Sequence, residues 1–300
     1  MLFRSQLFGG WEFGILFFMA ILYIAGFIIN PGFFGSSDAV SAILRDTARF
    51  GVMAVGMTFV IVNKELDLSV GSILGLVATI FSIAYSPNHF DLGIGWSVFF
   101  GVITGLAVGL INGFLVTRLK VPAFIATLTM LFIGRGLVLG LTGGKTIAFD
   151  TKAVGDRAFF ILGETNAFGL NTQILIFLIV AVIGMFALAK TRTGYETYAV
   201  GGNEQASGYA GIPTRWIRMR SYLISSLTAS IAGLMIVAQD KGITSQYGQG
   251  AELIVIAAVI VGGASIAGGR GRVLGAVLGS ALVVLIDKVL REGFPITRII

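Results

Sequence analysis

The stretch WSVFFGVITGLAVGLINGFLV, residues 96–116, contains no charged side chain. A helix needs about 20 mainly apolar residues to cross the hydrocarbon core of a bilayer, so this stretch is long enough to span one. Its glycines, Gly101, Gly105, Gly109 and Gly113, recur every four residues and therefore share one helix face. We expect that face to pack against another helix of the chain, although a dimer contact or a pore lining would show the same pattern.

Two further glycine series have the same spacing of four. One begins the last apolar run, and the other closes the fifth. We expect both to serve close helix packing, because the absence of a side chain lets another backbone approach. The residues are Gly271, Gly275 and Gly279 in the first series, and Gly136, Gly140 and Gly144 in the second.

The composition of the 300-residue chain places it in a membrane. Apolar residues make up 56%, charged residues only 12%, and the mean hydropathy is +0.92. An average soluble domain has about 25% charged residues, so this chain cannot build a water-soluble surface. Soluble enzymes, nucleic-acid-binding proteins and disordered chains are thereby excluded. With no cysteine and a single histidine, His89, we expect neither a disulfide framework nor a multi-histidine metal site.

Apolar runs recur along the whole sequence. They predict an all-α integral membrane protein, a polytopic bundle of about 9 to 10 transmembrane helices that forms one domain over residues 1–300. The nine runs cover residues 11–29, 47–62, 68–85, 96–116, 122–141, 173–188, 222–238, 253–267 and 273–289.

Basic residues on alternate connecting segments predict the orientation. If the N-terminus is cytoplasmic, then Arg118, Lys120, Arg270, Arg272 and the basic residues of 190–220 all lie inside. The positive-inside rule favours that arrangement. The longest outer connection, 142–172, is balanced in charge.

Polar side chains within the apolar runs are candidates for a solute route. Charge inside a bilayer is costly and must face protein or water, and neutral amides and hydroxyls suit a neutral polyhydroxylated solute. Many such groups simply bond to neighbouring helices, so both interpretations stay open for each. The candidates are Asn63, Asp67, Asn112, Thr127, Thr129 and Arg135.

Two of these candidates allow more than one structural interpretation. Asp67, in ELDLSVG (65–71), lies either in a polar joint between two halves of a broken helix or in a plain cytoplasmic turn capped by Asp67 or Ser69. Arg135 could pair with a carboxylate, extend toward the membrane interface, or line the route.

No catalytic constellation is present. GGKT at 143–146 resembles the end of a phosphate-binding loop, but that motif requires glycine at position 139, which is Leu139. The sequence also lacks an evident proton relay. We therefore expect no catalytic residue and no ATP hydrolysis by this chain.

The polar segment 190–220 predicts a short helix on the inner membrane face. Gly201 and Gly202 interrupt the chain, Asn203 can cap a helix over residues 204–210, and Gly211 and Pro213 end it. Such a helix either docks a cytoplasmic partner or lies at the interface without one.

Four segments together resemble a known family. They are LDLSVGS (66–72), VPAFIATLTMLFIGRGL (121–137), AVGGNEQASGYAGI (199–212) and ELIVIAAVIVGGASIAGGRGRVLG (252–275). Their order and spacing are similar to those of permease subunits of bacterial ATP-binding-cassette importers for monosaccharides such as ribose, xylose and arabinose, or for a furanose-derived signal. The resemblance extends over about residues 10–290.

The resemblance implies a partner set and a location. The expected partners are cytoplasmic ATP-binding cassette subunits, a second permease subunit (identical or different), and a periplasmic binding protein. The binding protein delivers a sugar or polyol to the permease, which lies in the bacterial inner membrane. No nucleic acid is expected, and no cofactor on this chain, because ATP and magnesium belong to the ATPase. The segment expected to be the coupling helix, which docks on that ATPase, comprises Gly202, Asn203, Glu204, Gln205, Ala206, Ser207, Gly208, Tyr209 and Gly211.

One departure from the family pattern concerns the number of spans. Members usually have about ten, with both ends inside, whereas nine are predicted here. We expect the final helix to be missing from the chain, with 288–300 as a loop leading onward; two merged spans would be the other explanation.

The rival functions are a self-contained secondary transporter and a structural or receptor-like membrane protein.

Overall fold

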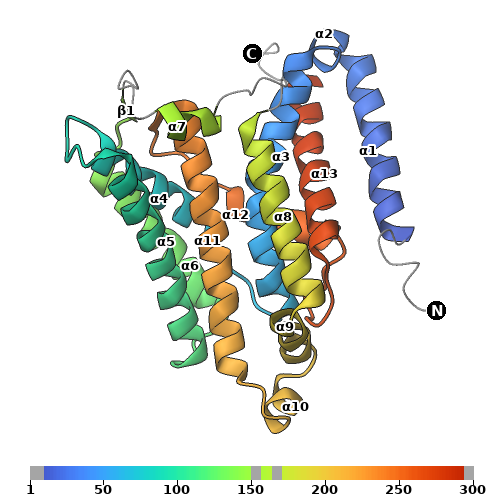
Figure 1. The fold of residues 1–300 in the computed structure, drawn as a ribbon. Helices are drawn as coiled ribbons and strands as arrows, with labels where there is room; N and C mark the ends of the chain where they lie inside the picture. The colour runs from blue at the N-terminus through green and yellow to red at the C-terminus, as the bar shows by residue number, and fades with distance from the viewer. Residues whose placement is uncertain (1–9, 150–156, 164–170, 294–300) are drawn as a thin grey trace.

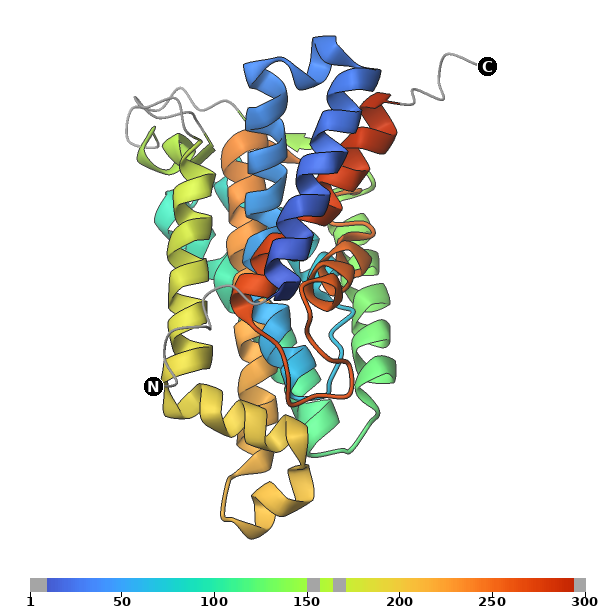
Figure 2. The ribbon, with the colours of Figure 1, turned by 90° about the vertical axis from the view of Figure 1, so that its right-hand side faces the viewer.

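The computed structural model describes residues 10–149, 157–163 and 171–293, which form an elongated bundle of helices (Figures 1 and 2). One end of the bundle carries the short helix α2 (Pro31–Phe34), and the opposite end carries α9 (Arg192–Gly202) and α10 (Glu204–Tyr209). We call these the α2 end and the α10 end. Helix α1 begins near the middle of the bundle's length and runs toward α2, so its N-terminal end points toward the α10 end.

Within the described residues, six helices are long and apolar enough to cross a membrane. Large apolar side chains cover the outer faces of several of them, such as Phe17 (70% exposed) and Phe132 (66%), as a helix in lipid requires. The six are α1 (Gly10–Ile29), α5 (Gly93–Thr117), α6 (Ala123–Thr142), α8 (Thr172–Lys190), α11 (Thr214–Asp240) and α13 (Val273–Gly293).

Three more helices occupy predicted spans without meeting that criterion. They are α3 (Ser37–Val62), which carries charged residues in its first half, and the shorter α4 (Val70–Tyr85) and α12 (Ala251–Val261). The helical membrane architecture is therefore confirmed, and the count of nine or ten crossings stays a prediction.

Helix α11 is the central element of the bundle. In its most apolar window 72% of the residues are buried, against 17% in α1. It packs against α3, α4 and α5, and Tyr222 and Ile217 on α11 are fully buried there. This position places α11 beside the polar segment between α3 and α4 that is described below.

Glycine faces determine which helices approach closely. A methyl group at Gly105 or Gly109 of α5 would overlap Ser230 or Ser226 of α11, so the α5 face packs inside the molecule as expected. A methyl group at Gly275 of α13 would overlap the Gly262 carbonyl after α12. The series from Gly136 to Gly144 differs, because nothing lies within contact distance of those positions. The expectation that this third series packs within the chain is wrong.

Two predicted spans have different boundaries in the structure. The run 47–62 belongs to a helix that begins at Ser37, because the Ser36 hydroxyl accepts a hydrogen bond from the Ala39 N–H at 3.1 Å and starts the helix early. The run 253–267 is helical only to Val261. Gly263, with φ +90°, turns the chain there, since the left-handed region favours glycine.

The tail predicted as a loop is partly helical. Helix α13 continues to Gly293, where Lys288 pairs with Asp46 at 2.8 Å and Arg291 with Asp287 at 2.8 Å. Val289 packs beside Phe34 in a small apolar cluster at the α2 end. The loop prediction is therefore wrong for 288–293, and 294–300 lie outside the described residues.

A small region of short strands and short helices lies at the α2 end. Strands β1 (Ile147–Ala148) and β2 (Gly242–Ile243) pair antiparallel, with Ile147 opposite Ile243. The short helices α7 (Arg157–Phe160) and η2 (Ile161–Gly163) lie beside them.

Candidate functional site

The α9–α10 corner is built by local capping. The Thr191 hydroxyl accepts from the Gly194 N–H at 3.4 Å at the start of α9, and the Asn203 side chain accepts from the Ala206 N–H at 2.9 Å at the start of α10. Gly211, with φ +81°, ends the corner in the left-handed conformation that glycine permits. The predicted short helix capped by Asn203 is confirmed. Helix α9 was not predicted, since that region was expected to be a loop.

Helix α10 stands clear of the bundle at its end (Figure 1). Among the predicted coupling residues only Ser207 is buried, whereas Tyr209 is 84% exposed. A methyl group at Gly202 or Gly208 would meet nothing within 4 Å. The corner therefore has free space around it for another protein.

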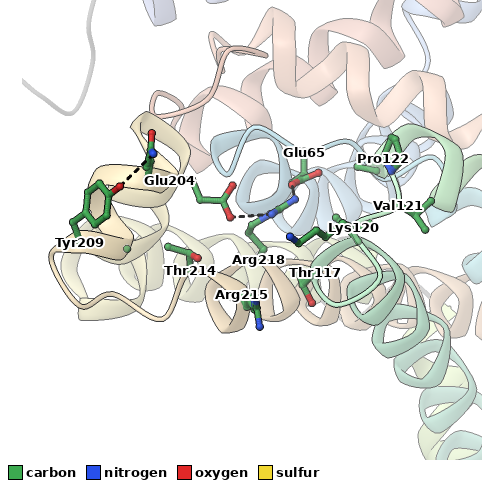
Figure 3. Close-up of a pocket in the computed structure, with 14 residues that line it drawn as sticks. Glu65, Thr117, Lys120, Val121, Pro122, Glu204, Tyr209, Thr214, Arg215 and Arg218 are labelled. Carbon is green, nitrogen blue, oxygen red and sulfur yellow. Dashed lines mark hydrogen bonds and ion pairs between the residues drawn. The ribbon is translucent and has the colours of Figure 1, made fainter.

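A cavity of about 830 Å³ lies between α10, the start of α11 and the α5–α6 turn (Figure 3). Its wall is polar on the α10 side and includes the connecting segment between α3 and α4. The lining residues are Glu65, Val116, Thr117, Lys120, Val121, Pro122, Ala123, Glu204, Gln205, Gly208, Tyr209, Thr214, Arg215 and Arg218.

An ion chain runs along this wall. The Arg218 Nη1 group donates to Glu204 Oε1 at 3.0 Å, and its Nη2 group pairs with Glu65 Oε1. The Tyr222 hydroxyl donates to the second oxygen of Glu65 at 3.3 Å. Burial raises the pKa of the Glu65 carboxyl, and the Arg218 guanidinium opposes that rise. One guanidinium thus joins α10 to the segment between α3 and α4.

The segment 63–69 is buried inside the bundle at Asn63 and at 67–69, whereas Lys64 is exposed. Asp67 is fully buried, and its Oδ1 accepts from the Ser69 N–H at 2.9 Å and the Ser69 hydroxyl at 2.6 Å. Its Oδ2 accepts from the Ser225 hydroxyl of α11 at 2.9 Å. This environment favours a buried polar joint over a plain surface turn, because a surface turn would leave the carboxylate in water.

Three more predicted route residues gather around this segment. The Asn112 amide of α5 donates to the Ser69 hydroxyl at 2.8 Å, and the Asn63 amide donates to Ser221. The Thr127 hydroxyl of α6 donates to the Ala123 carbonyl at 2.8 Å and approaches the Leu66 carbonyl at 3.4 Å. The structure thus brings Asn63, Asp67, Asn112 and Thr127 to one place.

Arg135 belongs to a separate contact. Its Nη2 group lies 3.7 Å from Glu252 Oε2 of α12 and also donates to the Gly248 carbonyl, while Nη1 donates to the Tyr247 carbonyl at 2.9 Å. Of the three possibilities for Arg135, the structure shows the carboxylate pair. Gly71 makes this contact possible, since a methyl group there would overlap the Glu252 carboxylate.

Thr129 is not part of the buried group. It is exposed on the outer face of α6, whereas Thr127 is fully buried. Two residues correspond to about 200° around a helix, so these threonines point to opposite sides.

Sequence reasoning missed the partners of these residues on α11. Arg218, Ser221, Tyr222 and Ser225 recur at helical spacing, which is the signal that could have revealed a polar face. The predicted span began at 222, so Arg218 was assigned to a loop, whereas α11 begins at Thr214. Glu252 was missed because nothing in its own sequence neighbourhood points to Arg135.

Comparison with known proteins identifies relatives along most of the chain. Residues 39–299 match the protein family described as branched-chain amino acid transport system, permease component. No solved structure matches the chain.

Three curated relatives illustrate the similarity. The ribose import permease protein RbsC of Haemophilus influenzae is 35% identical over 91% of this chain and 84% of its own length. The ribose import permease protein RbsC of Escherichia coli K12 is 35% identical over 85% of this chain and 78% of its own length. The autoinducer 2 import system permease protein LsrC of Yersinia pestis is 35% identical over 88% of this chain and 72% of its own length.

Proposed function

We propose that this chain is the membrane-spanning subunit of an ATP-driven importer for a sugar or polyol. The basis for this is its family: the chain belongs to the branched-chain amino acid transport system permease components. Curated relatives are named for ribose import and autoinducer 2 import, which supports a small polyhydroxylated solute. A periplasmic binding protein delivers the solute, and a separate ATPase supplies the energy. A second permease subunit, identical or different, completes the membrane part.

The observation that carries this proposal is the exposed α10 corner. Residues 202–211 form a capped helix that stands clear of the bundle, with Ser207 its buried anchor and Tyr209 its most exposed side chain. A rigid exposed helix of this kind can transmit a movement of a docked protein to the bundle. We propose that the ATPase binds there, which makes the α10 end cytoplasmic and places the start of α1 on the cytoplasmic side of the inner membrane.

The solute route of the proposal passes the buried polar group around 63–69. An amide of α5 and hydroxyl groups of α6 and α11 converge there beside the Asp67 carboxylate, and they provide the hydrogen-bonding groups that a neutral sugar requires. A high-affinity site in the membrane is unnecessary, since tight binding would slow release. Among the predicted route residues, Asn63, Asp67, Asn112 and Thr127 fit this role better than Thr129.

Substitution of Gly208 by tryptophan tests the docking surface. Nothing among the described residues lies within 4 Å of a Cβ atom added at this exposed position, so we expect Gly208→Trp to keep the fold while its ring obstructs a partner. We expect the variant to reach the membrane in normal amounts and to lose co-purification with the ATPase.

The matched control is Gly95→Trp in α5, at the α2 end, where an added side chain also meets nothing within 4 Å. That variant should retain the ATPase. Full retention of the ATPase by Gly208→Trp would rule out α10 as the docking site.

A further inference from the structure

The ion chain forms part of the wall of the cavity beside α10. Glu65 and Arg218 both line it, and their side chains are only 10% and 19% exposed. Its volume of about 830 Å³ falls within the range of roughly 300–1,000 Å³ found for small-molecule pockets. The cavity is therefore large enough for a solute, and part of its wall is formed by charged groups that bind one another.

Polar side chains continue from that wall into the bundle. Arg218, Ser221, Tyr222 and Ser225 share one face of α11, and they contact Glu65, Asn63 and Asp67 of the buried segment. Behind the ion chain, two buried acceptors, Oδ1 of Asn63 and Oδ1 of Asn112, have no hydrogen-bond donor among the described residues. A buried acceptor without a donor costs about 1–3 kcal/mol, so these oxygens suit the hydroxyl groups of water or of a polyhydroxylated solute.

The two contacts of Arg218 differ in strength. Glu204 is half exposed, and exposed ion pairs contribute little to stability. Glu65 is nearly buried, and removing one partner of a buried pair leaves an uncompensated charge at high cost. The guanidinium is therefore held mainly by Glu65, while Glu204 offers a second acceptor that moves with α10.

We propose that the cavity is the cytoplasmic exit of the solute route, that it accepts a neutral polyhydroxylated solute, and that Arg218 is its gate. Glu65 holds the gate closed. Movement of α10 draws Arg218 toward Glu204. The Glu204 carboxylate then compensates the charge of the Arg218 guanidinium as Arg218 leaves Glu65. The buried polar group becomes accessible from the cavity. This inference rests on the proposed function, because α10 must be moved by a docked ATPase.

Cysteine labelling tests the gate directly, because the natural chain contains no cysteine. The reporter is Ser225→Cys, a fully buried position behind Arg218. The complete importer is placed in inside-out membrane vesicles and treated with a membrane-impermeant trimethylammonium methanethiosulfonate reagent. We expect slow labelling without ATP and faster labelling when ATP is added.

Two substitutions in this background should have opposite effects. Glu65→Gln removes the carboxylate that holds the gate and should raise labelling without ATP by about tenfold or more. Glu204→Gln should leave that slow rate unchanged and abolish the rise caused by ATP. A merely structural role of the ion chain would not separate these two readouts.

Three controls keep the test decisive. Arg118→Met removes an exposed charge from the α5–α6 turn, outside the cavity lining and without breaking the ion chain, and should change neither rate. Ser82→Cys, fully buried in α4, should stay unlabelled in the Glu65→Gln background. Because Arg218→Met alone leaves Glu65 without its cation and can prevent assembly, the double variant Glu65→Gln/Arg218→Met is used instead, and it should label as fast as Glu65→Gln.

The outcomes distinguish this inference from the proposed function. Arg118→Cys, on the exposed α5–α6 turn at the α10 end and outside the predicted docking segment, should be labelled in the same vesicles; if it is not, the orientation of the proposed function is wrong. If Arg118→Cys is labelled, the gate is overturned by any of three results. These are an unchanged rate in Glu65→Gln, an equal rise in Arg118→Met, and a parallel rise at Ser82→Cys.

Discussion

Asp67 shows how a single carboxylate can organise a buried turn. It accepts hydrogen bonds from the Ser69 backbone, the Ser69 hydroxyl and the Ser225 hydroxyl, so all three donors depend on one side chain. Since α3 ends at Val62 and α4 begins at Val70, this carboxylate ties the intervening segment to α11. The buried polar group is therefore part of the structure as well as a candidate route.

Substitution of Asp67 should separate loss of charge from loss of hydrogen bonds. Asp67→Ala leaves buried donors unsatisfied, at about 1–3 kcal/mol each, and should lower the thermal unfolding temperature of the purified permease clearly. Asp67→Asn keeps one acceptor oxygen and should lower it less. Thr129→Ala is the control, because an exposed substitution of this kind changes stability by no more than about 0.5 kcal/mol. Equal losses in both Asp67 variants would contradict the role of the oxygen acceptors.

The Arg135–Glu252 contact allows a double-mutant cycle. Both side chains are mostly buried, so Arg135→Met or Glu252→Gln alone leaves a partner uncompensated, and the double variant should be more stable than the sum of the two losses. We expect a coupling energy within about 0.5–3 kcal/mol from thermal or chemical unfolding in detergent. The matched control is the exposed pair Arg291–Asp287, whose cycle should give a coupling near zero. Additive losses at Arg135 and Glu252 would show that their contact does not stabilise the chain.

At the scale of elements, close approach between backbones decides how the helices pack. Gly275 of α13 faces the Gly262 carbonyl just after α12, and Gly105 of α5 faces the Ser230 hydroxyl of α11. The first contact is with backbone, which cannot rotate away as a side chain can. The two glycine faces look alike in sequence but differ in how rigid their neighbours are.

Alanine substitution at Gly275 tests this packing. The added methyl group overlaps a backbone carbonyl, and overpacking costs typically about 1–3 kcal/mol, so Gly275→Ala should lower the temperature at which the detergent-solubilised permease loses its monodisperse peak in size-exclusion chromatography. Gly140→Ala is the control, since nothing lies within 4 Å of that position. A destabilisation of equal size in both variants would contradict the role of close packing at Gly275, because alanine has a higher helix propensity than glycine at either site.

Charged contacts join helices at both ends of the molecule, and the buried polar group lies inside. At the α2 end, Arg49 donates to Gln173 and Gln239, while Lys288 pairs with Asp46. At the α10 end, Arg218 joins two carboxylates. These contacts at the two ends connect helices whose other faces are apolar. Helix α10 remains exposed, as the proposed docking of the ATPase requires.

Transport by the isolated chain distinguishes the proposed importer from a self-contained secondary transporter. Under a proton or sodium gradient, liposomes that contain only this chain should not accumulate the radiolabelled sugar or polyol that its binding protein binds. Liposomes that also contain the ATPase and the binding protein should accumulate it when ATP is supplied. Accumulation driven by an ion gradient alone would establish the secondary transporter and exclude the proposed function.

The sequence by itself determined the membrane class, most helices and the α10 corner. Hydropathy over about 20 residues is a local property, and Asn203 caps α10 through atoms three residues away, so both can be read from neighbouring residues. Helix boundaries at Ser37, Val261 and Gly293 were predicted less well, because capping at Ser36, the turn at Gly263 and ion pairs of Lys288 override the hydropathy pattern.

Only the tertiary structure decided which polar groups meet. Glu65 and Arg218 lie far apart in sequence, as do Arg135 and Glu252, and no local pattern pairs them. The structure also separates Thr127 from Thr129, which hydropathy treats alike. The physical reason is that burial of a charge or an amide is tolerable only beside a partner, and helix packing, rather than local sequence, brings that partner into reach.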